Sequence, residues 1–72
     1  MSKIDRVSKE ISKLRSEGMN PVKIEMSRSF AIALKTEMMP QINKYFVNGR
    51  MELDGVPWAI GDIKGFKVEV AS

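Results

Sequence analysis

The sequence predicts an α+β domain: an N-terminal helix, then a strand, a second helix and a small antiparallel sheet. Three observations support this prediction. Apolar residues recur at helical spacing in residues 2–18. Residues 50–70, RMELDGVPWAIGDIKGFKVEV, alternate with period two and break at glycines, which is typical of strands joined by turns. The length of 72 residues leaves room for one small domain. We expect three or four antiparallel strands with a helix on one face.

The N-terminal helix is expected to be amphipathic and basic. Its apolar stripe is spaced by 3, 4 and 3 residues, and Gly18 stands where a left-handed C-cap belongs. A stripe this narrow is not stable alone in water, so the helix must dock. Residues 1–18 therefore form an arm or a docked helix, and residues 19–72 form a compact α+β domain. The stripe packs on the domain's own sheet, on a second copy or on an assembly partner; we expect the intermolecular contact, through Ile4, Val7, Ile11 and Leu14.

The middle of the chain predicts a strand followed by a helix. Residues 22–26 alternate apolar and charged side chains, and Ser27 is a suitable N-cap for a helix over residues 28–39. This helix is apolar over much of its circumference, which indicates burial on more than one side. Pro40 ends it or begins a further short turn through Ile42.

Two turn signals organise the second half of the chain. Asn48-Gly49 and Asp54-Gly55 each separate apolar runs, as type I′ hairpin turns do. Pro57 cannot donate to a strand ladder and should lie at an edge or a bulge. The expected core comprises apolar residues of the second helix and the sheet: Phe30, Leu34, Met38, Leu53, Trp58, Ile60, Phe66 and Val68.

The composition argues against an enzyme. The chain has no Cys, which excludes disulfides and thiolate metal sites, and no His, which removes the commonest general base and the commonest transition-metal ligand. Four carboxylates in the second half fall in turns or alternate with core positions, and they should not form a catalytic pair: Glu52, Asp54, Asp62 and Glu69. We expect no cofactor, no metal and no catalytic residue. The lack of cysteine suits a reducing cytoplasm.

The charge distribution leaves nucleic-acid binding open as an alternative. The formal net charge is +3, and the basic excess lies before residue 50. This is sparse for a duplex-DNA binder. The candidate nucleic-acid contacts are Lys9, Lys13, Lys44 and Arg50. No apolar run approaches the roughly 20 residues that span a bilayer, and the N-terminus has no signal-peptide core, so we expect no membrane contact.

Three phrases carry a resemblance to a known group of proteins. KIEMS ends a strand at a serine, SFAIALKTEMM forms a helix, and LDGVPWAIGD forms a hairpin. In outline, from Pro21 to Val70, this resembles small proteins of unknown role from tailed bacteriophages and prophages. It is also similar to the closing segment of tailed-phage capsid proteins, with Gly55-Val56-Pro57 as the motif-like part. The resemblance implies phage origin and a structural or accessory role in the host cytoplasm or with the virion.

We therefore expect a non-catalytic, phage-encoded interaction or assembly module that self-associates. Its expected partners are a second copy or a phage or host protein. The alternative is a small factor that binds nucleic acid or inhibits a host protein. The salt dependence of binding distinguishes the two hypotheses. The affinity for nucleic acid falls steeply as the salt concentration rises, whereas apolar association stays constant or strengthens.

Overall fold

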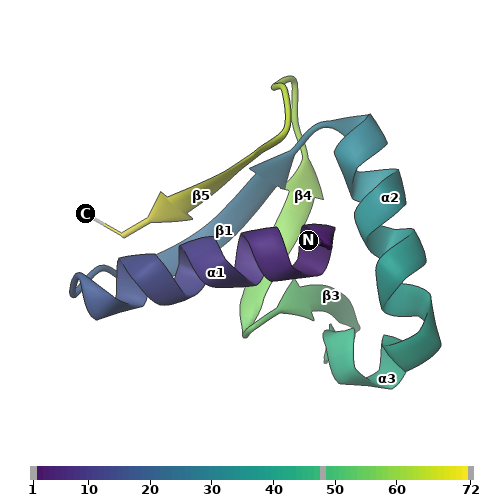
Figure 1. Ribbon diagram of the computed structural model, residues 1–72, viewed down its shortest axis with the longest axis horizontal. Helices are drawn as coiled ribbons and strands as arrows, with labels where there is room; N and C mark the ends of the chain where they lie inside the picture. Colours follow the sequence, from purple (N-terminus) through teal and green to yellow (C-terminus); the bar gives the residue numbers. More distant parts are fainter. Residues whose placement is uncertain (1, 48, 72) are drawn as a thin grey trace.

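The fold has two layers, with helices α1 and α2 packed on one face of a mixed sheet (Figure 1). The structure is a computed structural model that describes residues 2–47 and 49–71. In chain order the elements are α1 (Lys3–Ser16), β1 (Pro21–Met26), α2 (Arg28–Met38), the 3₁₀ turn η1 (Met39–Gln41), α3 (Ile42–Tyr45), β2 (Phe46–Val47), β3 (Arg50–Leu53), β4 (Val56–Ile60) and β5 (Phe66–Val70).

The predicted α+β class is confirmed, but the sheet is mixed. Its described strands lie in the order β2-β3-β4-β1-β5, and β1 pairs with β4 in parallel. The other neighbours are antiparallel. A parallel pair needs a long crossover, and the segment from α2 to β3 supplies it. The expectation of a purely antiparallel sheet of three or four strands missed this crossover.

Local signals place the element ends where the sequence predicts them. The Ser2 hydroxyl accepts a hydrogen bond from the Asp5 N–H (3.1 Å), and the Ser27 hydroxyl accepts one from the Phe30 N–H (3.2 Å). Gly18 has φ +81°, the left-handed conformation expected after α1. Asp54 (φ 52°) and Gly55 (φ 80°) form the tight β3–β4 turn.

The other predicted turn, Asn48-Gly49, includes a residue outside the described part of the chain. The strands on either side of it, β2 and β3, pair as a hairpin would. Of the apolar run before Asn48, only Phe46 and Val47 form a strand, because Lys44 and Tyr45 belong to α3. Tyr45 is buried, which a helical turn at this point achieves.

The two faces of the sheet differ in chemistry. Ile24 of β1 is in register with Trp58 of β4 and Val68 of β5, so these three side chains share the face that carries the helices. The opposite face bears charged residues in cross-strand pairs, and the Lys23 ammonium lies 3.9 Å from the Glu69 carboxylate. That face is therefore the solvent side of the sheet.

The predicted core residues of α2 are buried in the structure, whereas the prediction is wrong at the end of β4. Phe30, Leu34, Met38 and Leu53 are buried as predicted. Ile60 is 55% exposed, so its predicted burial is wrong. The remaining three predicted residues are partly buried and pack against the core: Trp58, Phe66 and Val68.

Helix α1 is part of this core, which corrects the expected intermolecular role of its stripe. Val7 and Ile11 are 0% exposed, Ile4 packs against the core and Leu14 is half-buried. A side chain without exposed surface cannot contact a second copy. The buried residues of α1 join the same cluster as those of α2 and the sheet.

Polar contacts hold both ends of α1. Near the C-terminal end, Arg15 Nη2 donates to the Asp54 carbonyl at 2.8 Å. In the middle of the helix, the Ser8 hydroxyl donates to the Asp54 carboxylate. At the N-terminal end, the Glu37 carboxylate accepts from the N–H of Lys3 (3.0 Å) and of Ile4 (3.2 Å). A carboxylate at a helix N-terminus pairs with otherwise free N–H groups and complements the helix dipole.

These contacts predict an acid-sensitive step in stability. The hydrogen bond from the Lys3 N–H, assisted by that from Ile4, lowers the pKa of Glu37 below its usual 4.5, against a smaller opposing effect of burial. A carboxylate with a lowered folded-state pKa stabilises the fold above its unfolded pKa, and this stability is lost as pH falls through the folded pKa. Between about pH 6 and about pH 3, the native protein should lose more unfolding free energy than Glu37→Gln does. Equal losses in urea titrations at each pH would show that Glu37 does not anchor α1.

Candidate binding groove between α2 and β4

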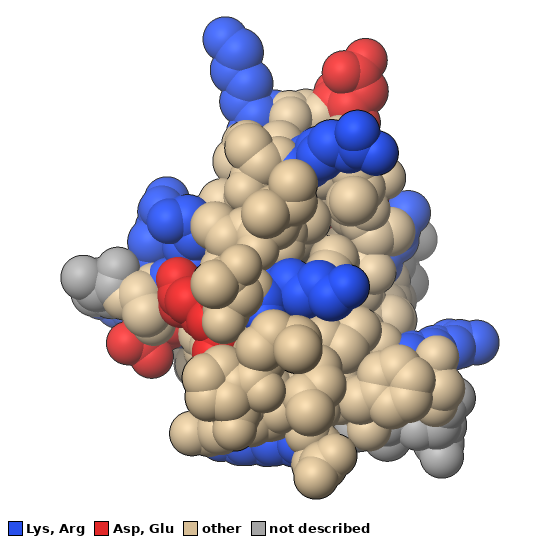
Figure 2. All heavy atoms as spheres, turned by 90° about the vertical axis from the view of Figure 1, so that its right-hand side faces the viewer, with Lys and Arg blue, Asp and Glu red and all other residues tan. Residues whose placement is uncertain are grey.

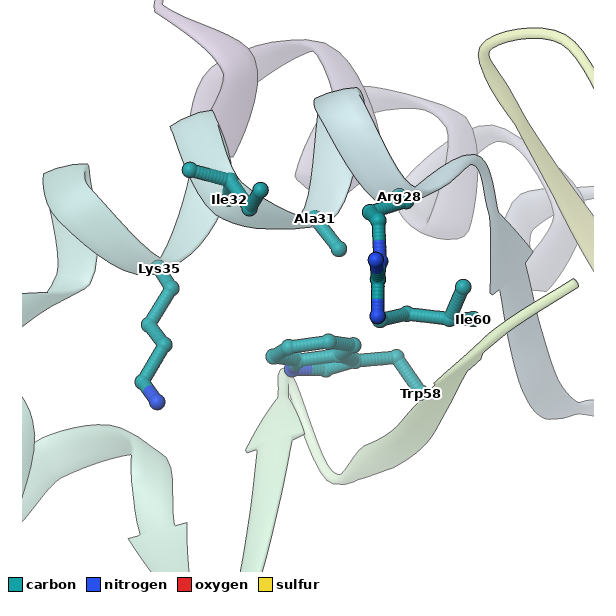
Figure 3. Close-up of a pocket in the computed structure, with 6 residues that line it drawn as sticks. All are labelled: Arg28, Ala31, Ile32, Lys35, Trp58 and Ile60. Carbon is teal, nitrogen blue, oxygen red and sulfur yellow. The ribbon is translucent and has the colours of Figure 1, made fainter.

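A groove lies between α2 and the second half of β4, with a cavity volume of about 340 Å³. Figure 3 shows the Trp58 ring lying across its floor, beneath α2. Arg28 and Lys35 extend from the helix toward β4 at opposite ends of the ring. We call this the α2–β4 groove; its lining residues are Arg28, Ala31, Ile32, Lys35, Trp58 and Ile60.

Helical and strand periodicity bring these side chains together. Positions 28, 31, 32 and 35 follow the spacing of one helix face, while Phe30, Leu34 and Met38 turn into the core. Trp58 and Ile60 are two residues apart on β4 and therefore share a sheet face. Ala31 adds only a methyl group, so the helix leaves open space above the ring.

The groove is apolar inside and basic at its ends. Ile32 is 61% exposed and Ile60 is 55% exposed, so both present apolar surface to solvent. The lining contains two cations, Arg28 and Lys35, and no carboxylate. On the molecular face that Figure 2 presents, basic side chains project over a largely uncharged surface and acidic ones lie toward its margins. The groove thus favours a ligand that is apolar in part and negatively charged.

Strand β4 has an unpaired edge along this groove. Its register with β3 ends at Glu52 opposite Pro57, while β1 pairs with it up to Ile60. The Gly61 N–H donates to the Met26 carbonyl at 2.8 Å, so Gly61 faces β1. Successive residues of a strand direct their N–H and C=O to opposite sides, which turns those of Ile60 away from β1. Beyond Pro57, no strand in the described part of the chain covers that side of β4.

Trp58 is half-buried rather than fully buried. Its indole N–H has no hydrogen-bond partner within residues 2–47 and 49–71. Val56, two residues earlier on the same face, is 1% exposed. Burial therefore declines along β4 from the turn toward Ile60, and Trp58 marks the boundary between core and groove.

The four cations proposed to contact nucleic acid are exposed but lie on separate elements. Lys9 and Lys13 project from α1, Lys44 from α3 and Arg50 from β3. The Lys44 ammonium lies 5.7 Å from the centre of the Tyr45 ring, whose side chain is buried. Tyr45 is buried and Trp58 is half-buried, whereas Phe46 of β2 is 53% exposed, so the described residues present a single well-exposed aromatic ring for base stacking.

The sequence did not indicate the helix side of the groove. In the sequence, Arg28 and Lys35 belong to no motif, and Ile32 only adds to the apolar circumference of the helix. One signal was present: Ile32 has Arg28 four residues before it and Lys35 three residues after it. All three lie on the side of the helix away from Phe30 and Leu34. This pattern describes an apolar patch with basic ends.

The described residues form neither a metal-binding cluster nor a membrane-spanning helix. The described chain contains no group of three or more His, Cys, Asp or Glu residues placed to hold a metal ion. No helix in it is both long enough and apolar enough to cross a bilayer. None of its polar or charged residues is fully buried.

Comparison of the chain with protein-family models, curated proteins and solved structures finds no match. The α2–β4 groove is therefore the feature of the molecule that indicates a function.

Proposed function

We propose that the protein is a non-catalytic interaction module that binds a segment of another protein in the α2–β4 groove. The observation that carries this proposal is the conjunction of exposed Ile32 and Ile60, the half-buried Trp58 ring and two cations around one cavity. Apolar patches with an aromatic and an Arg are typical of sites where a few residues supply most of the binding energy.

The resemblance to small tailed-phage proteins supports a proposal for the origin and the partner of the protein. We propose that the protein is phage-encoded, acts in the host cytoplasm or with the virion, and binds a phage or host protein. The proposal does not include self-association through the α1 stripe, because Val7 and Ile11 lie inside the chain's own core.

A selection experiment tests the proposal. A displayed library of random heptapeptides is panned on the whole protein, and the recovered peptides are assayed against Ile32→Glu. We expect at least about tenfold weaker binding, because the new charge occupies the apolar rim and opposes anionic ligands. Ile32 is 61% exposed, so the fold should tolerate the change.

Met39→Glu is the matched control. Met39 is also a large exposed apolar residue (55%), and it lies in η1, outside the groove lining. The control should bind as the native protein does. Recovered peptides that bind Ile32→Glu and the native protein equally, or the recovery of none, would overturn the proposed function.

A further inference from the structure

We propose that the ligand of the α2–β4 groove is an extended acidic segment of a partner protein, which adds as a sixth strand to the free edge of β4. This inference rests on the proposed function and specifies the chemistry and the geometry of its partner. It assigns the main-chain groups of Ile60 as hydrogen-bonding partners. It assigns Arg28 and Lys35 as the groups that select carboxylates.

The sheet itself supplies the first argument. An unpaired strand edge presents N–H and C=O groups in the spacing that an added strand requires. Edge strands are usually protected by charge, by proline or by cover from another element. Pro57 does not protect this edge, because it lies four residues before Gly61 and therefore also directs its main chain toward β1. Ala59 and Ile60 are exposed and carry no charge. The edge beside the groove is thus open at its apolar end.

The positions of the two cations supply the second argument. Arg28 and Lys35 are seven residues apart on α2, which corresponds to about 10 Å along a helix axis. In an extended strand, positions i−2 and i+2 lie on one face about 13 Å apart. A segment with an apolar residue at its centre can therefore place that residue over Trp58 and direct flanking carboxylates toward Arg28 and Lys35. Charged partners of opposite sign also accelerate association.

A second copy of the chain fits this edge less well. Pairing two β4 edges about a two-fold axis would bring each α2, with Arg28 and Lys35, toward the same cations of the other copy. Like charges across an interface oppose association. Charge complementarity therefore favours an acidic partner over self-association.

Synthetic peptides test both parts of the proposal. The probes are capped heptapeptides with glutamate at positions 2 and 6, threonine at positions 1, 3, 5 and 7, and valine, leucine, isoleucine or phenylalanine at position 4. Binding is measured by calorimetry and by fluorescence of Trp58, the chain's single tryptophan. At least one member should bind with Kd below about 1 mM, and replacing both glutamates by lysine should weaken it at least about tenfold.

Backbone methylation tests strand addition directly. The best peptide is made with N-methyl groups at its odd positions and, separately, at its even positions. Only one set of N–H groups faces β4 in an added strand. One methylated version should therefore lose binding and the other should retain it.

Two variants of the protein test the same contact from its own side. Ile60→Ala shortens the side chain and keeps the N–H, whereas Ile60→Pro also removes the N–H that faces away from β1. Proline is tolerated at a strand edge, and the β1 ladder keeps its Gly61 bond. Ile60→Pro should bind at least about fivefold more weakly than Ile60→Ala. If Ile60→Pro fails to fold, the methylated peptides decide the question without altering the protein.

The outcomes separate this inference from the proposed function. A best heptapeptide that tolerates both methylation patterns, while the library peptides still depend on the groove, would overturn strand addition and leave the interaction module intact. Equal binding of the glutamate and lysine peptides would overturn the acidic partner. If none of the four peptides binds, or if the protein instead binds single-stranded oligothymidine with steep salt dependence, the inference fails. Dimerisation in sedimentation that Ile60→Pro abolishes would replace the acidic partner by a second copy.

Discussion

Ile11→Ala is expected to lower the free energy of unfolding by about 2–5 kcal/mol, the range for truncating a large buried aliphatic side chain. Ile11 is 0% exposed and belongs to the cluster that joins α1, α2 and the sheet. Small domains have about 5–15 kcal/mol in total, so the loss is a large share of their stability. Urea unfolding followed by circular dichroism measures it. Ser12→Ala, at the neighbouring exposed position, should change stability by less than about 0.5 kcal/mol.

Urea unfolding of a truncated chain decides whether α1 is part of the core or a separate arm. Removing residues 1–17 should leave a chain that no longer unfolds cooperatively, because α1 covers apolar surface on α2, β1 and β5. It also removes Arg15 and Ser8, which anchor the β3–β4 turn. A truncated chain that still unfolds cooperatively, or an Ile11→Ala variant as stable as Ser12→Ala, would contradict the place of α1 in the core.

Trp58→Ala is expected to have the largest effect on binding, with peptide affinity falling by at least about 30-fold, the equivalent of 2 kcal/mol at an interfacial hot spot. Figure 3 shows the reason: the indole ring is the broadest surface in the groove and lies across its floor. Calorimetry is the suitable measurement, because the variant lacks the fluorescent reporter.

Two further variants show that the loss arises in the groove. Trp58→Phe keeps an aromatic floor and should retain most of the affinity. Ile24→Ala removes a fully buried partner of Trp58 on β1, and it should destabilise the protein more than Trp58→Ala does. Full affinity in Trp58→Ala would place the binding surface elsewhere.

The features that depend on neighbouring residues could be predicted from the sequence. Ser27 and Gly18 mark helix ends, and Asp54-Gly55 marks a turn, because each acts through its own backbone or that of residues close by. The α+β class follows from the same local periodicities. Glu37 lay on the apolar side of its helix, where it accepts hydrogen bonds from the N-terminus of α1, a segment more than thirty residues away.

The features that depend on distant pairing could not be predicted. Period-two alternation gives the face of a strand but not its neighbour, so the parallel pairing of β1 with β4 was invisible. Ile60 shares a sheet face with buried Val56 but is 55% exposed, and no local signal in the strand shows where the cover of that face ends. The α1 stripe was misassigned for a similar reason, since a narrow apolar stripe shows that a helix must dock and not where it docks.

The groove was missed because its two sides come from separate parts of the chain. The strand pattern predicts Trp58 and Ile60 as core residues, and no pattern in the helix gives Arg28 and Lys35 a role. Only the crossover from β1 to β4 brings α2 over β4 and converts these into one surface. A site formed by separate parts of the chain can be recognised only when the topology of the fold is known.

Amide hydrogen exchange at Ile60 and Gly61 tests most directly that the edge of β4 is open and takes up an added strand. In the free protein, the Gly61 amide should exchange slowly, because it donates to Met26, and the Ile60 amide should exchange quickly. At saturating concentrations of the best glutamate heptapeptide, the Ile60 amide should become protected while Gly61 changes little. An Ile60 amide that is already protected in the free protein, or that stays unprotected in the complex, would contradict strand addition at β4.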